Sequence, residues 1–418
     1  MNRVILHSDM NCYYASVEHL YHPELKDKPV AVGGDPEKRH GIVLTADYNA
    51  KKYGVKTGMT LREAYDLCPQ ITFVPPHMDR YLRFSRMARE IYADYTDRQE
   101  PFGIDESWLD VTESASVRGD GYKIAREISD RIKYELGLTV SIGVSYNKIF
   151  AKLGSDYKKP DAITTFYENE RETKAWPLPA SKLLYVGRST TRRLKKIGIN
   201  TIGDIANAEE EILVSHLGKM GSVLKCFALG YDASPVKKEG ASAPIKSIGN
   251  SITTCRDLLD LEDVKLVLYA LSESVSRRLR ENGFSCRTVE VHLRDNSLFS
   301  FTRQRPLKHP SDITSEIAEA GVGLVRDNYD FSRPLRSIGI RGCDLIEGEY
   351  WDQGSIFETP ELREKRMLMD RAVDSIRDRF GYYSVQRGLM LNDRGLSALN
   401  AREDHIVHPV GYDLSPQP

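Results

Sequence analysis

No stretch of the sequence approaches the ~18 consecutive apolar residues that a membrane-spanning helix requires. The first residues, "MNRVILHSDM", also lack the long apolar core and the small-residue cleavage site of a signal peptide. The six cysteines are scattered and form no Cys-x-x-Cys pair, which argues against a disulfide framework and against structural zinc. Together these absences predict a reduced, cytoplasmic protein that has no membrane partner.

Net charge is almost absent too, because 59 basic residues face 60 acidic ones. Proteins that bind nucleic acid non-specifically are usually basic overall, so this balance counts against such a binder unless cations gather locally. Two stretches do gather them. "TTRRLKKIG" (190–198) holds four lysines or arginines, "FTRQRPLKH" (301–309) holds three, and neither contains an acid. Any contact with nucleic acid therefore has to come from such patches.

Internal repeats and low-complexity tracts are also lacking, while 418 residues exceed one ordinary core and predict about two to four domains. An apolar strand in "RVILHSDM" ends at Asp9, and "TVSIGVS" (139–145) reads as a second strand. Apolar residues recur at helical spacing over 78–97 and at Ile124, Ile128 and Ile132. This order predicts an α+β sheet covered by helices.

The texture of the sequence changes after about residue 166. Residues 167–231 have helical patterning, and "DASPVKKEGASAPIKS" (232–247) has the composition of an inter-domain linker. A second α+β unit follows, and beyond it we expect a mixed tail with one helix over 360–379.

An acidic pair interrupts a strand-like segment in "FGIDESWLD". Asp105 and Glu106 are costly there unless a basic partner or a metal compensates them. Together with Asp9 they would make an oxygen-rich cluster of the kind that magnesium favours in phosphoryl transfer. Taken alone, the spacing of the three acids favours turn or ordinary surface residues over a metal site, because short acidic motifs are common.

Donors suited to a triphosphate occur in "TADYNAKKYGVKTGM", which offers Thr45, Tyr48 and Lys51. "SDYKKPD" places Lys159 just before a proline. The alternative is an amphipathic helix with a solvated basic face in the first case and a lysine placed by the helix dipole in the second.

Four segments resemble, in order and spacing, the motifs of the Y-family (translesion) DNA polymerases, and within them the bacterial DNA polymerase IV and UmuC-like branch. These segments are "HSDMNCYYASVE", "LTADYNAKKYGVKTGM", "GIDESWLD" and "SIGVSYNKIFAKLGSDYKKPDA". The resemblance runs from residue 3 to about residue 345. It implies a template-directed, low-fidelity DNA polymerase that adds dNTPs to a primer 3′-OH by two-metal phosphoryl transfer and extends past DNA lesions.

The fold implied by the resemblance is a multidomain α+β right hand. Its expected parts are a ferredoxin-like palm (1–10 and 78–166), small fingers (11–77), a helical thumb with a helix-hairpin-helix (167–231), the linker (232–247), an α+β little finger (248–346), and a tail (347–418).

Site residues are implied position by position. Asp9, Asp105 and Glu106 would be catalytic and bind two Mg²⁺ ions, with the backbone carbonyl of Met10 as a further ligand. Tyr14 occupies the steric-gate position, where a ring excludes a ribose 2′-OH. The other positions expected to hold the triphosphate are Thr45, Tyr48, Lys51 and Lys159.

The resemblance also implies contacts with the backbone of primer-template DNA. We expect them at Gly187, Arg188 and Lys195 in the thumb, and at Thr302, Arg303, Arg305, Arg336 and Arg341 in the little finger. "QGSIF" (353–357) resembles the bacterial sliding-clamp peptide, with Gln353, Ile356 and Phe357 as its anchors. The protein is expected to act as a monomer.

Three positions depart from the family pattern. Many relatives read Asp-x-Asp in the first motif, where this chain has Asn11. Lys51 stands where arginine is common, so it keeps the charge but loses bidentate geometry. The usual Gly-Ile-Gly turn of the thumb reads Gly187-Arg188-Ser189. Two alternatives remain open at this point: a catalytically weak, DNA-bound scaffold that recruits repair factors, and a nucleotidyl cyclase built on a similar palm.

Overall fold

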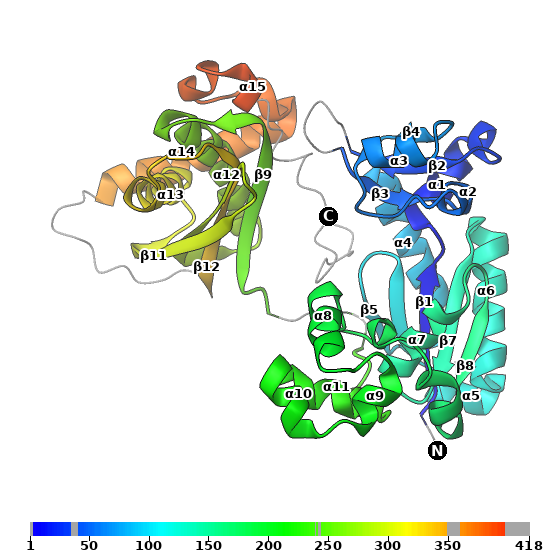
Figure 1. Cartoon of the computed structure of the whole chain (residues 1–418). Coiled ribbons are helices and arrows are strands. Elements are labelled where there is room, and N and C mark those ends of the chain that lie inside the picture. Colours follow the sequence, from blue (N-terminus) through cyan, green and yellow to red (C-terminus); the bar gives the residue numbers. More distant parts are fainter. Residues whose placement is uncertain (1–2, 35–40, 239, 241–243, 349–359, 398–418) are drawn as a thin grey trace. The chain divides into compact units, whose positions relative to one another are not determined.

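The computed structural model describes residues 3–34, 41–238, 240, 244–348 and 360–397. They form two compact units that divide near residue 242 (Figure 1). No helix within these described ranges is both long and apolar enough to cross a membrane.

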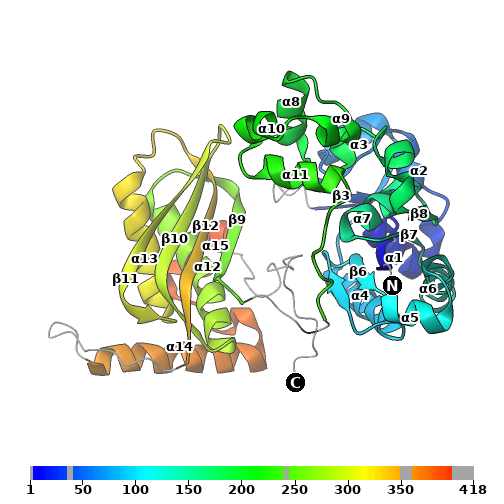
Figure 2. The ribbon, with the colours of Figure 1, turned by 90° about the horizontal axis from the view of Figure 1, so that it is seen from below.

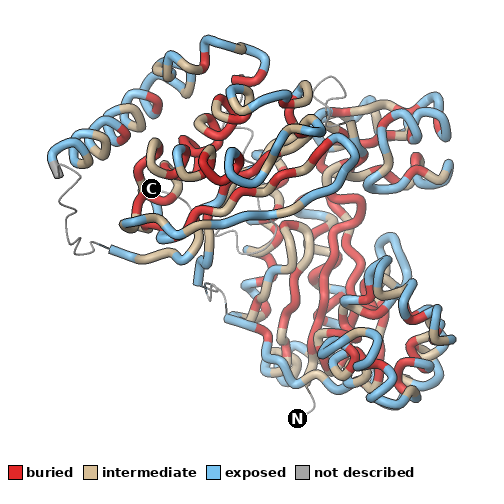
Figure 3. The backbone as a smooth tube through the Cα atoms, turned by 60° about the vertical axis from the view of Figure 1, so that its left-hand side comes forward, coloured by how far each residue is buried: buried red, intermediate tan, exposed pale blue. Residues whose placement is uncertain are grey.

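A five-stranded sheet is the centre of the first unit. Its order is β5-β6-β1-β7-β8, from β1 (Ile5–Met10), β5 (Gln99–Pro101), β6 (Glu106–Asp110), β7 (Val140–Ser145) and β8 (Ile163–Phe166). The central strands β1 and β7 are buried along their whole length, and Figure 3 draws buried backbone in red. Such a sheet needs a cover on both faces.

Helices supply both covers. α4 (Met78–Ala93) and α6 (Gly121–Leu136) pack on one face, where Leu6 of β1 joins their apolar residues in one core. α7 (Lys148–Tyr157) packs on the other face. The expected helix over 78–97 therefore ends four residues early, at Ala93. α5 (Thr112–Arg118) precedes α6.

The approach of α7 to the sheet is unusually close. A Cβ atom added to Gly143 of β7 would lie 1.8 Å from the carbonyl oxygen of Ala151, and one on Gly154 would lie 2.8 Å from Gly143 Cα. The helix therefore rests on the strand backbone itself, which leaves its side chains little freedom to shift.

A smaller sheet, β3-β2-β4, has its own core. Its strands are β2 (Val30–Gly33), β3 (Val43–Ala46) and β4 (Thr72–Val74). The neighbouring helices are α1 (Tyr13–Tyr21), α2 (Tyr48–Lys52) and α3 (Leu61–Leu67). A further core contains α8 (Arg188–Lys196), α9 (Ile202–Asn207), α10 (Glu210–Leu217) and α11 (Met220–Ala228), joined by apolar residues of α7 and by Phe166 of β8.

The second unit is a four-stranded antiparallel sheet with helices on one face. Its order is β11-β10-β12-β9, from β9 (Ser247–Leu258), β10 (Phe284–Asp295), β11 (Ser300–Ser311) and β12 (Leu335–Glu347). α12 (Leu261–Glu281) and α13 (Thr314–Asn328) contribute their apolar residues to its core.

The tail is more structured than expected. α14 (Pro360–Phe380), orange in Figure 2, lies against α12 and α13 through ion pairs, and α15 (Arg394–Ser397) contacts β9 and α12. The described part of the tail, residues 360–397, thus docks on the second unit. The short helical turns of the molecule are Pro23–Leu25, Glu168–Glu170, Arg171–Ala175, Ala180–Lys182, Tyr382–Ser384 and Gly388–Leu391.

Mixed helices and sheets in several cores confirm the expected multidomain α+β class. The domain names and boundaries given above stay predictions.

Candidate active site

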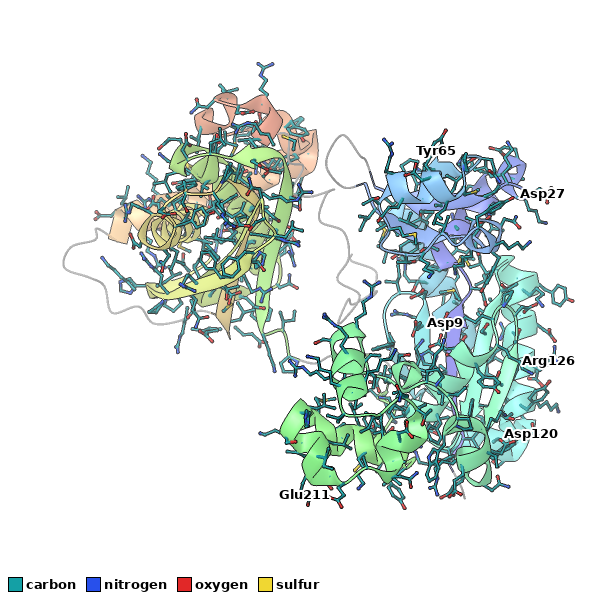
Figure 4. The ribbon with its side chains drawn as sticks, in the orientation of Figure 1. Asp9, Asp27, Tyr65, Asp120, Arg126 and Glu211 are labelled. Atoms are coloured by element: carbon teal, nitrogen blue, oxygen red, sulfur yellow. The ribbon has the colours of Figure 1, made fainter. Side chains whose placement is uncertain are left out.

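Strand alternation brings the first two acidic residues together. Along β1, Ile5, His7 and Asp9 face α7, while Leu6 and Ser8 face α4 and α6, because neighbouring side chains point to opposite faces. Asp9 lies directly opposite Glu106 in the antiparallel pair β1–β6 (Figure 4 labels Asp9). Two carboxylates, distant in sequence, therefore project side by side.

Asp105 precedes the first residue of β6, so the acidic pair marks where that strand begins. Its carbonyl oxygen accepts a hydrogen bond from the Met10 amide at 3.0 Å, which ties the end of β1 to this turn. Burial of the carboxyl raises the pKa of Asp105 to about 7, and the charges of Glu106 and Asp9 add to the effect. Burial and Glu106 likewise raise the pKa of Asp9.

Two lysines of the α7 segment offset part of this negative charge. Lys152 Nζ lies 2.8 Å from Glu106 Oε2 and 3.2 Å from Asp9 Oδ2. Lys159 Nζ lies 2.7 Å from Asp9 Oδ2. Asp156 holds both lysines, at 3.1 and 2.9 Å. We call these residues with Asp105 the acidic cluster.

The donor set of the acidic cluster fits a hard divalent cation. Its ligand atoms are carboxylate oxygens, and an ammonium group already bridges Asp9 and Glu106 as a stand-in cation. In the described residues, no three Asp, Glu, His or Cys side chains form a ready-made metal site. Metal binding would therefore require the lysines to move away from the carboxylate oxygens.

Asn11, which departs from the family pattern, is a buried hydrogen-bonding centre. Its Oδ1 accepts from Ser141 Oγ at 2.8 Å, from the Asp161 amide at 3.3 Å and from Tyr48 OH at 3.4 Å. It thus links β7, the segment after α7 and α2. Tyr48, a predicted triphosphate contact, is brought beside the acidic cluster by this bond.

The other predicted nucleotide contacts lie in different surroundings. Tyr14 stacks on Tyr81 of α4, with ring centroids 4.3 Å apart and planes 8° apart. Lys51 Nζ lies 3.1 Å from Cys12 Sγ and 4.9 Å from the ring centroid of Tyr48. Thr45 is on β3, opposite Val32. The acidic cluster therefore gathers Asp9, Asp105, Glu106 and Lys159, while Tyr48 contacts Asn11, two residues from Asp9.

Two residues that contact the acidic carboxylates were not predicted from the sequence, namely Lys152 and His7. His7 donates or accepts a 2.8 Å hydrogen bond between Nδ1 and Ser155 Oγ of α7, and its Nε2 lies 3.3 Å from Glu106 Oε2. Burial lowers the pKa of His7 well below its usual value. A signal for Lys152 did exist, because Lys152, Asp156 and Lys159 recur at the i, i+4, i+7 spacing of one helix face.

The predicted DNA contacts divide between the two units. Gly187 precedes α8, which begins at Arg188 with no side-chain cap, and Lys195 lies in its last turn. In β11, Arg303 and Arg305 reach the α13 side, where they contact Asn328 and Asp327. Strand alternation turns Thr302 to the opposite face, so these three side chains do not form one surface.

The remaining predictions lie on β12 or outside the described residues. Arg336 is part-buried, and Arg341 Nη1 lies 3.6 Å from Glu290 Oε1 on the neighbouring strand. The clamp-peptide residues Gln353, Ile356 and Phe357 fall in the range that the structure does not describe.

Comparison with known proteins places the chain in a family. Residues 8–156 match the model described as "impB/mucB/samB family", and residues 245–356 match that of its C-terminal domain. The chain is 53% identical to a DNA polymerase IV of Acetivibrio thermocellus, over 96% of this chain and 100% of that one. It is 38% identical to a DNA polymerase IV of Pelotomaculum thermopropionicum, over 94% and 96% of the two chains.

A solved structure agrees with these likenesses. A chimeric Y-family DNA polymerase matches with a TM-score of 0.74 and 26% identity, over 82% of this chain and 100% of that chain. The resemblance inferred from the four sequence motifs is thereby confirmed. The chain belongs to the impB/mucB/samB family, the Y-family DNA polymerases, on the branch of DNA polymerase IV.

Proposed function

We propose that Asp9, Asp105 and Glu106 bind two Mg²⁺ ions, with the Met10 carbonyl as a further ligand, in the active site of this polymerase. The observation that supports the proposal most is the pairing of Asp9 with Glu106 across β1 and β6, bridged by a single cation. When bound, such ions activate the attacking hydroxyl and neutralise charge on the phosphates.

Membership of the family gives the reaction. The chain is a translesion DNA polymerase, which adds deoxynucleotides to a primer as a template directs and continues past damaged bases. The primer 3′-hydroxyl attacks the α-phosphate of the incoming nucleotide, and pyrophosphate leaves.

The chain's own side chains have distinct roles in this proposal. Tyr14, held flat against Tyr81, would present its ring to the sugar and exclude a 2′-hydroxyl by overlap. Lys159 lies just beyond the C-terminal end of α7. When the triphosphate binds, it would break its ion pair with Asp9 and pair with a phosphate oxygen instead. Tyr48, Lys51 and Thr45 would hold the remaining phosphate oxygens.

DNA would be gripped through its backbone by the cations of α8 and of β11 and β12, which is the kind of contact that tolerates distorted templates. We further propose that residues 353–357 bind a sliding clamp, and that the protein works as a monomer in the cytoplasm.

Primer extension with Mg²⁺ and dNTPs, on intact and lesion-bearing templates, tests the metal centre. We expect wild type to extend and Asp105→Asn to lose activity, while both bind primer-template DNA. Equal activity of the two proteins would refute the assignment of Asp105. Binding without extension by wild type would favour the scaffold, and cyclisation of a nucleotide without DNA would favour the cyclase.

The steric gate and the clamp peptide need separate tests. Tyr14→Ala should admit ribonucleotides, and unchanged discrimination against ribonucleotides would refute the gate.

Deletion of residues 353–357 should abolish stimulation by the clamp and leave basal extension intact. Equal stimulation of the deletion variant would refute the clamp assignment.

A further inference from the structure

Lys152 is the more enclosed of the two lysines in the acidic cluster, and the proposed function gives it no role. Its side chain is only 13% exposed, and its ammonium group lies within 3.2 Å of three carboxylates on three elements. These are Asp9 of β1, Glu106 of β6 and Asp156 of α7 itself. A buried lysine is costly unless it is fully paired, so its position here requires a reason.

The packing of α7 on the sheet fixes the position of this ammonium group. Gly154 of α7 packs against the backbone of Gly143 of β7, and Ser155 of α7 forms a hydrogen bond with His7 of β1. Lys152 is one helical turn from Ser155, so the helix delivers its side chain to the point where Asp9 and Glu106 meet. The lysine thus crosslinks β1 and β6 at their acidic ends.

The charges around it are unbalanced. The acidic cluster contains four carboxylates and two lysines, and like charges at this separation repel strongly at low local dielectric. The raised pKa values of Asp105 and Asp9 reflect burial and this repulsion. Burial lowers the pKa of Lys152, but Glu106, Asp9 and Asp156 outweigh it and the net pKa is raised.

Lys159 is different in reach and freedom. It lies two residues beyond the end of α7, its side chain is 29% exposed, and its ion-pair partners are Asp9 and Asp156. It can leave for a phosphate without opening the space between the strands. Lys152 contacts both strands and is more enclosed, so the two lysines are not equivalent.

We propose that Lys152 is a positioning residue, a built-in counter-cation that keeps Asp9 and Glu106 together in the metal-free protein and is displaced from their oxygens when divalent ions enter. The inference rests on the proposed metal centre. Asp156, one turn along α7 and 3.1 Å from Nζ, is the carboxylate that retains the displaced ammonium.

Binding of Mn²⁺ to the full-length, chelator-treated protein without DNA or nucleotide tests this role. The free ion is counted by its electron paramagnetic resonance signal, and Tm is measured with and without it. Lys152→Met keeps a long, unbranched side chain but removes its charge. This variant should bind Mn²⁺ roughly tenfold more tightly, because a competing cation is gone. Its metal-free Tm should fall by roughly 5 °C, and Mn²⁺ should restore it.

Three further variants separate the possible causes. Lys152→Arg retains the charge and should return both values most of the way to wild type. Lys158→Met, on the exposed neighbour of Lys159, should change neither value. Asp105→Asn should weaken Mn²⁺ binding, which identifies the site that is measured.

Failure of the inference can be told from failure of the metal centre. If wild type shows no Mn²⁺ binding that Asp105→Asn weakens, the proposed metal centre is wrong. If that binding is present but Lys152→Met resembles Lys158→Met in affinity and Tm, the counter-cation role is wrong. A Lys152→Met protein that stays unfolded at saturating Mn²⁺ also contradicts it, because the ion should replace the lost charge.

Discussion

The two units each bury a cluster of charged side chains, and the two clusters differ in composition. The acidic cluster of the first unit has more carboxylates than cations, and its cations are lysines. The second unit has a tail cluster in which Glu273, Asp370 and Asp374 pair with Arg280, Arg377 and Arg387 where α14 docks. An unbalanced cluster can accept a further cation, whereas a balanced one has nothing left to bind.

The choice of cation agrees with this difference. Arginine holds carboxylates through a rigid planar fork, and Arg387 uses it to contact both Glu273, at 3.0 Å, and Asp370, at 3.4 Å. Lysine is a point charge on a flexible stem and can be withdrawn. We infer that the tail cluster holds α14 in one fixed position, whereas the ion pairs of the acidic cluster are exchanged when a ligand binds.

The largest expected effect comes from removing one acid from the unbalanced cluster. Asp105→Asn should lower the rate of primer extension by about 10³-fold, because charge stabilisation in the transition state is lost. Its metal-free Tm should equal or exceed that of wild type, because the substitution also relieves repulsion from Glu106 and Asp9. Retained activity would contradict the metal assignment, and a lowered Tm would contradict the picture of an overcharged cluster.

Removing one acid from the balanced cluster should do the opposite. Glu273→Gln leaves Arg377, which is only 5% exposed, without its counter-charge at 2.9 Å. The free energy of unfolding should fall by about 3 kcal/mol, and extension at low temperature should stay unchanged. Urea denaturation measures the first and primer extension the second. The exposed pair Arg62–Asp66 gives the control, because Asp66→Asn should change neither quantity.

Much of both regions could be predicted from the sequence, for different reasons. Asp9, Asp105, Glu106 and Lys159 stand in motifs whose residue types carry the chemistry. The spacing of Lys152, Asp156 and Lys159 hinted at a shared helix face, but it could not identify the partners of Lys152. Asp9 lies 143 residues away, and it meets Lys152 only through the register of β1 with β6 and the packing of α7 on the sheet. Periodicity gave the helix α14 nearly to its ends.

The docking of the tail could not be read from periodicity. The face of α14 that packs on α12 and α13 is largely charged, with Asp370, Asp374 and Arg377 among its buried or part-buried residues. A search for an apolar stripe therefore finds no packing face there. The same limit applies to Thr302, Arg303 and Arg305, which share a motif but not a face of β11.

Asn11 offers a finer test of the unbalanced cluster. Asn11→Asp introduces the acid that the family resemblance led us to expect here, but it adds a carboxylate two residues from Asp9 and removes the Nδ2 donor to Ser141 Oγ. Metal-free stability should fall by about 1 kcal/mol, and extension should change by no more than a few fold. Thermal unfolding with and without Mg²⁺ checks the first point. A gain of metal-free stability would mean that the cluster is not overcharged.

The smallest expected effect concerns a contact elsewhere in the second unit. Arg256 of β9 pairs with Asp393, the residue just before α15. Its hydrogen bonds lower the pKa of Asp263, and the amides of Leu396 and Gly395 together with Arg256 lower that of Asp393. A carboxyl whose folded pKa lies below its unfolded value of about 3.9 contributes stability above that pH, and the contribution is lost as the pH falls through the folded pKa.

The amides of α15 (Arg394–Ser397) should therefore lose hydrogen-exchange protection below about pH 4, after correction for the intrinsic exchange rate, while those of α12 keep it. Arg256→Gln is the matched variant, because it removes the shared cation at 2.7 and 2.8 Å from the two acids and should weaken protection at neutral pH as well. In the Arg256→Gln variant at neutral pH the tail cluster should still hold α14, because its ion pairs do not include Arg256. Simultaneous release of α14 and α15 would show that the tail is one cooperative element, and that the balanced cluster does not act as a separate fastening.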